Sequence, residues 1–253
     1  VDMDGFTACM EDQKARARAN AKGDDWGSFN DVWVELSDKV TATEFDGYDN
    51  DVIEGAKVVA IVRNGESVES AAAGEDVEVV LDRTPFYAEM GGQQGDAGKL
   101  SAEGGVLTVA DTKNHNGLYA HVAHVAKGTL TVGAALTATL DAERRGFLRR
   151  NHTATHLLDA ALKQVLGEHV SQAGSLVTPE HLRFDFTHFE ALSSEQLKAV
   201  EDLVNQQIFA SKPVVTRVMG IDEAKAAGAV ALFGEKYRDV VRVVSVGAED
   251  QPF

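Results

Sequence analysis

Two histidines four residues apart, His152 and His156, have the spacing in this sequence that is best suited to chemistry. In a helix, positions i and i+4 lie on one face, one turn apart, so two imidazoles can bind one metal ion. At ~100° per residue, the pair projects to the side of Leu148 and away from an apolar stripe that begins at Phe147. Two solvent-facing histidines without a ligand are the alternative. Thr153 stands where the metalloprotease motif has its glutamate base, which excludes that motif.

Zinc takes three or four protein ligands, and the rest of the sequence offers no obvious third. The other histidines are His115, His121, His124, His169, His181 and His188. His121 and His124 are expected on opposite faces of a strand, so a shared metal is not expected. The single cysteine, Cys9, lies on a helical stripe with Phe6 and Met10, which favours a helix interface. One cysteine allows no internal disulfide, in keeping with a reducing cytoplasm.

A glycine-rich stretch at residues 84–98 reads TPFYAEMGGQQGDAG. It lacks the Gly-Lys-Ser/Thr of a phosphate-binding loop, and no helix is expected after it. Gly91 and Gly92 allow a positive φ or a close backbone approach. Gln93 can then present its amide to a ligand. The alternative is a tight structural turn between strands.

The elements that must position these residues fall into three blocks and predict an α+β fold. Residues 1–37 are expected to form a linker helix over 1–25 and then a loop. Residues 38–141 are expected to form a small antiparallel β-barrel, with a hairpin at Asn64-Gly65. Residues 142–253 are expected to form an α+β unit with an antiparallel sheet. Strands are predicted at 39–45, 58–63, 77–81, 106–110, 118–126, 130–140, 182–186, 214–219 and 240–246, and helices at 142–166, 194–210 and 222–227.

The formal net charge is −16, which argues against a polyanion as partner of the whole chain. A local basic patch is expected at residues 144–145 and 149–150. No apolar run approaches the ~20 residues of a membrane helix, and the acidic start does not resemble a signal peptide. We therefore expect a cytoplasmic protein without a membrane partner. The start at Val1 and the end at Phe253 favour a piece of a longer chain.

Together these motifs resemble the alanyl-tRNA synthetase family. The resemblance rests on five segments in order: Phe6 with residues 13–18, residues 84–96, 149–158 (RRNHTATHLL), 182–186 (LRFDF) and 229–237 (AVALFGEKY). They match the linker to the editing domain, its barrel signature, its metal-site helix, the following strand and a further signature. Free-standing editing proteins share the barrel and the metal helix. They are not expected to carry the linker helix, so a piece of the full synthetase is favoured.

The resemblance implies hydrolysis of mischarged tRNA. A pocket for the methyl group of alanine admits glycine and rejects serine only about a hundredfold, so a second site must remove errors. The substrate would be the ester that joins serine or glycine to the acceptor end of tRNA(Ala). Zn²⁺ would be held by His152 and His156 together with a downstream Cys-x-x-x-His that this chain does not contain. The chain alone is then expected to bind zinc poorly and to be inactive or weakly active. ATP would serve the full-length enzyme only.

The resemblance also implies roles for other residues. Thr155 lies beside the histidine pair, where its hydroxyl would test for that of serine. Gln172 matches a pocket glutamine of the family, and Gln93 is a further candidate for substrate binding. Arg149 and Arg150 are expected to touch tRNA phosphate. The role of zinc stays open between polarising the ester, activating water and holding the substrate. Two alternative functions are a non-catalytic tRNA-binding or structural module and a free-standing trans-editing hydrolase.

Overall fold

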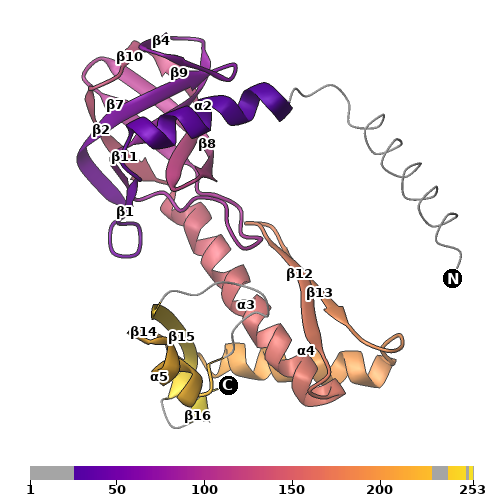
Figure 1. Ribbon diagram of the computed structural model, residues 1–253. Coiled ribbons are helices and arrows are strands. Elements are labelled where there is room, and N and C mark those ends of the chain that lie inside the picture. Colours follow the sequence, from indigo (N-terminus) through magenta and orange to yellow (C-terminus); the bar gives the residue numbers. More distant parts are fainter. Residues whose placement is uncertain (1–25, 230–238, 249–250, 253) are drawn as a thin grey trace, which may run out of the picture.

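The computed structural model describes residues 26–229, 239–248 and 251–252 (Figure 1). A β-barrel forms one lobe, and a long helix leads from it to a second lobe of mixed helices and strands (Figure 1). The predicted α+β class, with an antiparallel barrel ahead of the helix, is confirmed. The helix expected over residues 1–25, Cys9, and most of the segment at 229–237 lie outside the described residues.

The barrel lobe contains short strands that alternate with tight turns. They are β1 (Glu44–Phe45), β2 (Val52–Arg63), β3 (Glu66–Val68), β4 (Ser70–Ala72), β5 (Asp76–Leu81), β6 (Arg83–Thr84), β7 (Gly98–Ala102), β8 (Gly105–His115), β9 (Leu118–Lys127), β10 (Thr129–Thr131) and β11 (Ala135–Leu140). The main sheet has the order β11-β7-β8-β9-β5-β2-β3 and closes because β11 also pairs with β2. Alternate residues such as Val79, Leu107 and Val125 point inward and fill the barrel.

Two turns show how the sequence sets the barrel strands. Asn64 and Gly65 both have positive φ, 53° and 79°, as expected of the predicted two-residue hairpin between β2 and β3. The strand predicted at 130–140 is instead two strands, because Gly133 turns the chain with φ 85° between them. As a result β10 pairs with β4, whereas β11 pairs with β7 and β2.

A helix that the sequence reasoning did not predict, α2 (Trp26–Lys39), lies across the outside of the barrel (Figure 1). The region up to residue 37 was expected to end in a loop, which is wrong. Val32, Trp33 and Leu36 are buried against the barrel with Val62 and others. Their helical spacing places them on one face, and burial of that face outweighs the local turn signals at the start of the segment.

The second lobe starts with α3 (Ala142–Leu166), whose bounds match the prediction. The lobe continues with β12 (Ser171–Val177), β13 (Leu182–Thr187), α4 (Ser194–Phe209), β14 (Val214–Gly220), α5 (Ile221–Ala226), β15 (Val240–Ala248) and β16 (Gln251–Pro252). The Asp141 side chain accepts from the backbone N–H of Arg144 and caps α3, which ends at Gly167. Ser193 and Gln196 form a capping box at the start of α4. Strand β12 was not predicted, because its sequence SQAGSLV is poor in β-branched residues.

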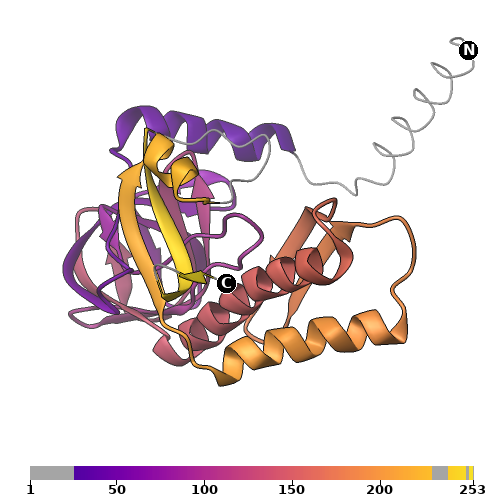
Figure 2. The same cartoon turned by 90° about the horizontal axis from the view of Figure 1, so that it is seen from below.

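The packed side of α3 changes along its length, which corrects the predicted stripe. Near its start, Leu148 is fully buried whereas Phe147 is 42% exposed. Near its end, Ala161 and Leu162 pack against Val200 of α4. Figure 2 shows α3 and α4 running side by side beyond the barrel. In its first turns, α3 packs on the side of Leu148. This is the side on which the sequence placed the histidines, so that side is not exposed along the whole helix.

Candidate functional site

The two histidines of α3 lie together at the surface of the helix. Their rings are stacked, with centroids 5.1 Å apart and planes inclined by 21°. Both residues are open to solvent on one side, while neighbouring elements cover part of each ring. One helical turn separates them, so the predicted pairing of His152 with His156 on one face is what α3 produces.

The surroundings of this pair lower the pKa of both imidazoles. Burial is the main cause for His152, and the charges of His156 and Arg242 add to it. Burial also lowers the pKa of His156, although Asp159 opposes the shift. Both shifts favour the neutral ring near pH 7. A neutral imidazole has a free lone pair, and this is the form that binds a metal ion.

The glycine-rich loop packs directly on β12. A Cβ atom on Gly92 would lie 2.3 Å from the carbonyl oxygen of Ser175, so only glycine fits at this approach. The backbone N–H of Val177 donates to the Gly92 oxygen (2.8 Å), and that of Gln94 donates to the Val177 oxygen (3.0 Å). The loop therefore runs along β12 like an added strand. The close approach explains Gly92, whereas Gly91 has open space around it and a positive φ of 61°.

Gln93 connects this loop to the histidine helix. Its side chain is only 8% exposed, and its Oε1 lies 2.5 Å from Nδ1 of His152. The two residues are 59 positions apart in the sequence. The fold thus brings the side chain of Gln93 into contact with that of His152, one of the two predicted metal ligands.

Gln172 lies on the side of β12 that faces α3. In the register of the hairpin it pairs with Phe186 of β13, and directly paired residues share a face of a sheet. Phe186 packs against the cluster that contains Leu162 of α3. The Gln172 amide donates to the Ser175 hydroxyl (3.2 Å), so Gln172 is linked to the strand on which the glycine loop rests.

Thr155 is buried between the two histidine positions. Its side chain is 6% exposed, and its hydroxyl donates to the carbonyl oxygen of Asn151 at 2.8 Å. The oxygen of the hydroxyl can still accept a hydrogen bond. Thr155 is therefore buried in α3, and its hydroxyl proton is used in a hydrogen bond within the helix.

The donor set of the histidine pair fits part of a zinc site. Among the described residues, no group of three or more His, Cys, Asp or Glu side chains could hold a metal ion. Asp159 lies one turn after His156, but its Oδ2 accepts from Lys163 at 2.7 Å. The described residues thus supply two imidazole ligands of the three or four that zinc takes.

The sequence matches known proteins over nearly its whole length. A family model described as tRNA synthetases class II (A) matches residues 1–144. The chain is 53% identical over 248 residues to the alanine–tRNA ligase of Rhizobium meliloti (strain 1021), covering 98% of this chain and 28% of the relative.

This chain belongs to the alanyl-tRNA synthetase family.

Two further relatives have the same name. The alanine–tRNA ligase of Sinorhizobium medicae (strain WSM419) is 54% identical over 248 residues, covering 98% of this chain and 28% of the relative. That of Chelativorans sp. (strain BNC1) is 48% identical over 252 residues, covering 99% of this chain and 28% of the relative. This chain therefore spans about 28% of the length of these relatives. In its described part, no helix is both long and apolar enough to cross a membrane.

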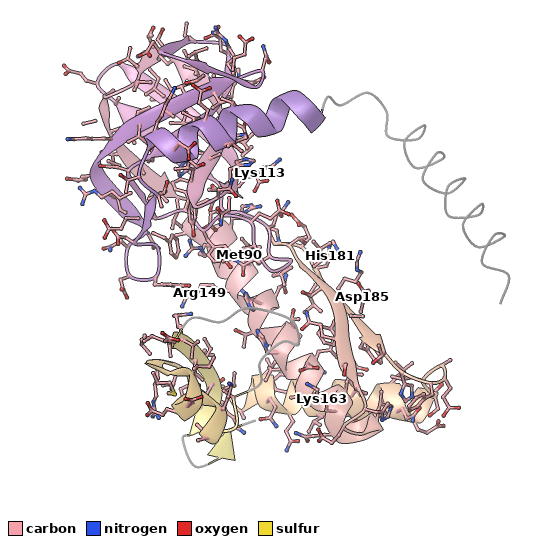
Figure 3. The ribbon with its side chains drawn as sticks, in the orientation of Figure 1. Met90, Lys113, Arg149, Lys163, His181 and Asp185 are labelled. Atoms are coloured by element: carbon pink, nitrogen blue, oxygen red, sulfur yellow. The ribbon has the colours of Figure 1, made fainter. Side chains whose placement is uncertain are left out.

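Of the four arginines in the predicted basic patch, only the second two, Arg149 and Arg150, are exposed. Arg145 is 9% exposed and binds Asp96 inside the barrel mouth, and Arg144 donates to the carbonyl oxygen of Gly95 (2.7 Å). Both are structural contacts. Arg149 and Arg150 remain exposed, and the guanidinium of Arg150 lies 4.6 Å from the ring centroid of Phe147. Figure 3 shows Arg149 projecting from the side of α3.

Sequence reasoning missed a buried histidine of the synthetase barrel. His121 is fully buried, and its Nδ1–H donates to the Val79 oxygen (2.8 Å). Its Nε2 therefore accepts from the hydroxyl of Thr84 (2.7 Å), which in turn accepts from the N–H of Phe86 (3.1 Å). Burial lowers the pKa of His121 to about 4. The segment TPF belongs to one of the family motifs, but nothing in its local pattern indicated this partner 37 positions away.

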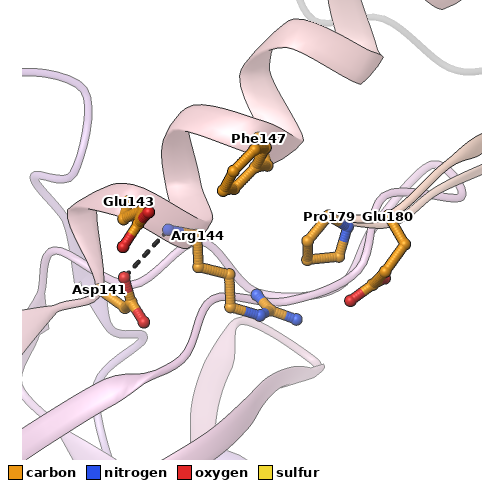
Figure 4. Close-up of a pocket in the computed structure, with 6 residues that line it drawn as sticks. All are labelled: Asp141, Glu143, Arg144, Phe147, Pro179 and Glu180. Atoms are coloured by element: carbon orange, nitrogen blue, oxygen red, sulfur yellow. Dashed lines mark hydrogen bonds between the residues drawn. The ribbon is translucent and has the colours of Figure 1, made fainter.

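A separate cavity of about 240 Å³ opens at the start of α3 (Figure 4). Its lining comes from the first turns of α3 and from the turn between β12 and β13: Asp141, Glu143, Arg144, Phe147, Pro179 and Glu180. Neither His152 nor His156 lines it. The candidate site is the surface between α3, the glycine loop and β12.

Proposed function

We propose that this chain is the editing part of an alanine–tRNA ligase. Its reaction would be hydrolysis of the ester that joins a misattached serine or glycine to the acceptor end of tRNA(Ala). The observation that carries the proposal is the pair of stacked imidazoles with lowered pKa values, joined to the glycine loop through Gln93. Family membership supports the ligase as the parent protein, whereas the editing reaction goes beyond what the names of the relatives state.

His152 and His156 would hold Zn²⁺ through their neutral rings. A bound zinc ion supplies Lewis acidity to an ester oxygen or a water molecule. Their position at the surface of α3 leaves room for further ligands from outside the described residues. Partial burial lowers the pKa of both imidazoles, which favours the neutral form that binds a metal ion.

Other side chains would bind and discriminate the substrate. Gln172 faces α3 from β12 and presents an amide beside the glycine loop. Thr155 offers the free acceptor capacity of its hydroxyl oxygen to the hydroxyl of a seryl group. Arg149 and Arg150 are exposed on α3 and would contact phosphates of the acceptor end.

The three blocks would divide the work. Residues 1–37 would connect to the preceding tRNA-binding region, 38–141 would form the barrel that positions the glycine loop, and 142–253 would carry the editing core. Together with ATP-dependent parts of the ligase outside this chain, they would act in the cytoplasm. The change from barrel strands that end with β11 at Leu140 to the helix α3 that begins at Ala142 supports the second of these boundaries.

A non-catalytic tRNA-binding module is the second candidate. The observation that favours it is the presence of only two metal ligands among the described residues. In that case Arg149 and Arg150 would bind tRNA, and the imidazoles would have no role in hydrolysis.

The test is hydrolysis of seryl-tRNA(Ala) by the full-length ligase that carries this chain. Replacement His152→Ala is expected to reduce the hydrolysis rate by about a hundredfold or more, the equivalent of losing a few kcal/mol of Lewis-acid stabilisation. His124→Gln, on an exposed part of β9, serves as control and should leave the rate unchanged. If the wild-type ligase leaves seryl-tRNA(Ala) intact while still binding it, the non-catalytic module is the correct function.

A further inference from the structure

We propose that Gln93 is a positioning residue that fixes His152 in the Nδ1–H tautomer, so that Nε2 presents the lone pair. This inference rests on the proposed function only where it assigns that lone pair to Zn²⁺. Gln93 was expected to bind substrate. The contact of 2.5 Å between its Oε1 and Nδ1 of His152 gives that oxygen a protein partner instead.

The chemistry of the contact decides the tautomer. An amide carbonyl oxygen accepts hydrogen bonds and cannot donate one, so Nδ1 of His152 must carry the proton. In a neutral imidazole the other nitrogen, Nε2, then has the free lone pair. Metal-binding histidines generally donate their second ring N–H to such an acceptor, which fixes both tautomer and ring orientation.

The backbone of Gln93 is held on two sides, so its amide does not adapt freely to the ring. Gln93 and Met90 exchange backbone hydrogen bonds (3.1 and 3.3 Å). On either side of Gln93, Gly92 and Gln94 bond to Val177 of β12. Figure 3 shows Met90 at the loop that lies beside α3 and the hairpin. The side chain of Gln93 therefore projects from a fixed strand-like segment.

The same loop is attached to α3 a second time, nearer the start of the helix. Arg144 donates to Oε1 of Gln94 (3.1 Å) and to the Gly95 oxygen (2.7 Å). Arg144 and His152 are about 12 Å apart along the helix axis at 1.5 Å per residue. Two attachments along the helix prevent the loop from rotating about either one. The position of Gln93 relative to His152 is thus set by the fold.

The tautomer can be measured on the 253-residue chain without metal or tRNA. Long-range ¹H–¹⁵N NMR correlations distinguish a protonated ring nitrogen from one with a lone pair, and at about pH 8 the rings are neutral. His152→Asn identifies the His152 signals by their loss. We expect wild-type His152 to carry its proton on Nδ1. A proton on Nε2 would overturn the inference.

Three variants separate positioning from a general effect on folding. Gln93→Leu removes the acceptor and should give a mixture of tautomers at His152. Gln93→Glu keeps an acceptor oxygen at the same reach and should restore the Nδ1–H form. Gln94→Leu is the matched control: it removes one bond to Arg144, which keeps its bond to Gly95, and it should leave the His152 signals unchanged. Unchanged His152 signals in Gln93→Leu would contradict the positioning role of Gln93. The near-UV circular dichroism of each variant shows whether it is folded.

Zinc affinity of the full-length ligase gives the second readout. Loss of such a supporting hydrogen bond typically weakens metal binding by about 10–100-fold, so Gln93→Leu should raise the zinc Kd by that factor. Gln93→Glu should recover most of the affinity, and Gln94→Leu should match wild type. Equal zinc Kd values in wild type and Gln93→Leu would overturn the positioning role.

The tautomer and the editing reaction can fail separately. A fixed Nδ1–H form in a ligase that does not hydrolyse seryl-tRNA(Ala) keeps this inference and removes the proposed function. Active hydrolysis with the proton on Nε2 of His152 removes this inference alone.

Discussion

Asp96 and Arg145, 49 positions apart, form a buried ion pair that joins the glycine-rich segment to α3. Nε of Arg145 lies 3.0 and 2.9 Å from the two carboxylate oxygens. The guanidinium also donates to the carbonyl oxygens of Gly47 (2.8 Å) and Pro85 (3.0 Å), and Asp96 accepts from the N–H of Tyr87 (2.7 Å). Both charges therefore have several partners, and the start of α3 is fixed against the barrel.

Removing one member of this pair should strongly destabilise the fold. Asp96→Ala leaves the Arg145 guanidinium buried without its counter-ion, which typically costs about 3–5 kcal/mol. Urea unfolding should show a decrease of that size in the free energy of unfolding. The control is Asp76→Ala, which removes an exposed partner of His124 and should cost less than about 1 kcal/mol. Equal losses in the two variants would contradict a special role for the buried pair.

His121 should make the barrel sensitive to mild acid. Its pKa is about 4 in the fold and 6.5 in an unfolded chain, so below about pH 6.5 only the unfolded state takes up the proton. Stability is full above that pH and is lost progressively as the pH falls toward 4, by on the order of 3 kcal/mol.

Urea unfolding at several pH values tests this linkage. His121→Gln should be less stable than wild type near pH 7 and should lose less further stability between about pH 6.5 and 4. His124→Gln changes an exposed histidine of the same strand and should keep the wild-type slope. A wild-type stability that stays constant over this range would show that His121 does not titrate as its burial predicts.

Gly92 is expected to tolerate no side chain, because it combines a positive φ with a close backbone approach. It has φ +81°, and an added Cβ would meet the backbone oxygen of Ser175 at 2.3 Å. Gly104 has a similar φ of +78° with nothing within 4 Å of an added Cβ. Gly104→Ala should therefore cost only the backbone strain, about 1–2 kcal/mol, whereas Gly92→Ala should cost more and displace the loop from β12. Similar losses in urea unfolding for both variants would rule out the close approach.

Arg149 and Arg150 should contribute electrostatically to tRNA binding. Removal of one cation that pairs with a phosphate reduces the steepness of log K against log salt concentration by roughly 1. We expect the double replacement with alanine to weaken tRNA(Ala) binding at low salt and to flatten that dependence in the full-length ligase. Lys163→Ala, at the far end of α3 from the barrel, is the control (Figure 3). A salt dependence that matches wild type would remove these arginines from the tRNA-binding surface.

The sequence predicted elements that depend on local signals. The helix predicted at 142–166 has the bounds of α3, the helix predicted at 194–210 ends one residue after α4, and Asn64-Gly65 marked the first hairpin. Caps and tight turns are decided by a few adjacent residues, so the chain shows them directly. The histidine pair falls in the same class because one helical turn defines it.

Features that depend on distant partners could not be predicted. Strand β12 forms because β13 and the glycine loop lie on its two sides, although its own residues have little strand preference. The contact of Gln93 with His152 joins residues 59 positions apart. The early turns of α3 were assigned the wrong packed side, because Leu148 meets the barrel and Phe147 meets solvent. These contacts form between elements that are distant in the sequence, so they become visible only in the folded structure.

Anomalous X-ray diffraction at the zinc absorption edge, from crystals of the full-length ligase, tests the central claim most directly. We predict a peak about 2.0–2.1 Å from Nε2 of His152 and from one ring nitrogen of His156, with Nδ1 of His152 facing Gln93. A peak bound through other residues, or zinc-loaded crystals without a peak at this pair, would contradict the claim that these two imidazoles hold the metal ion of an editing site.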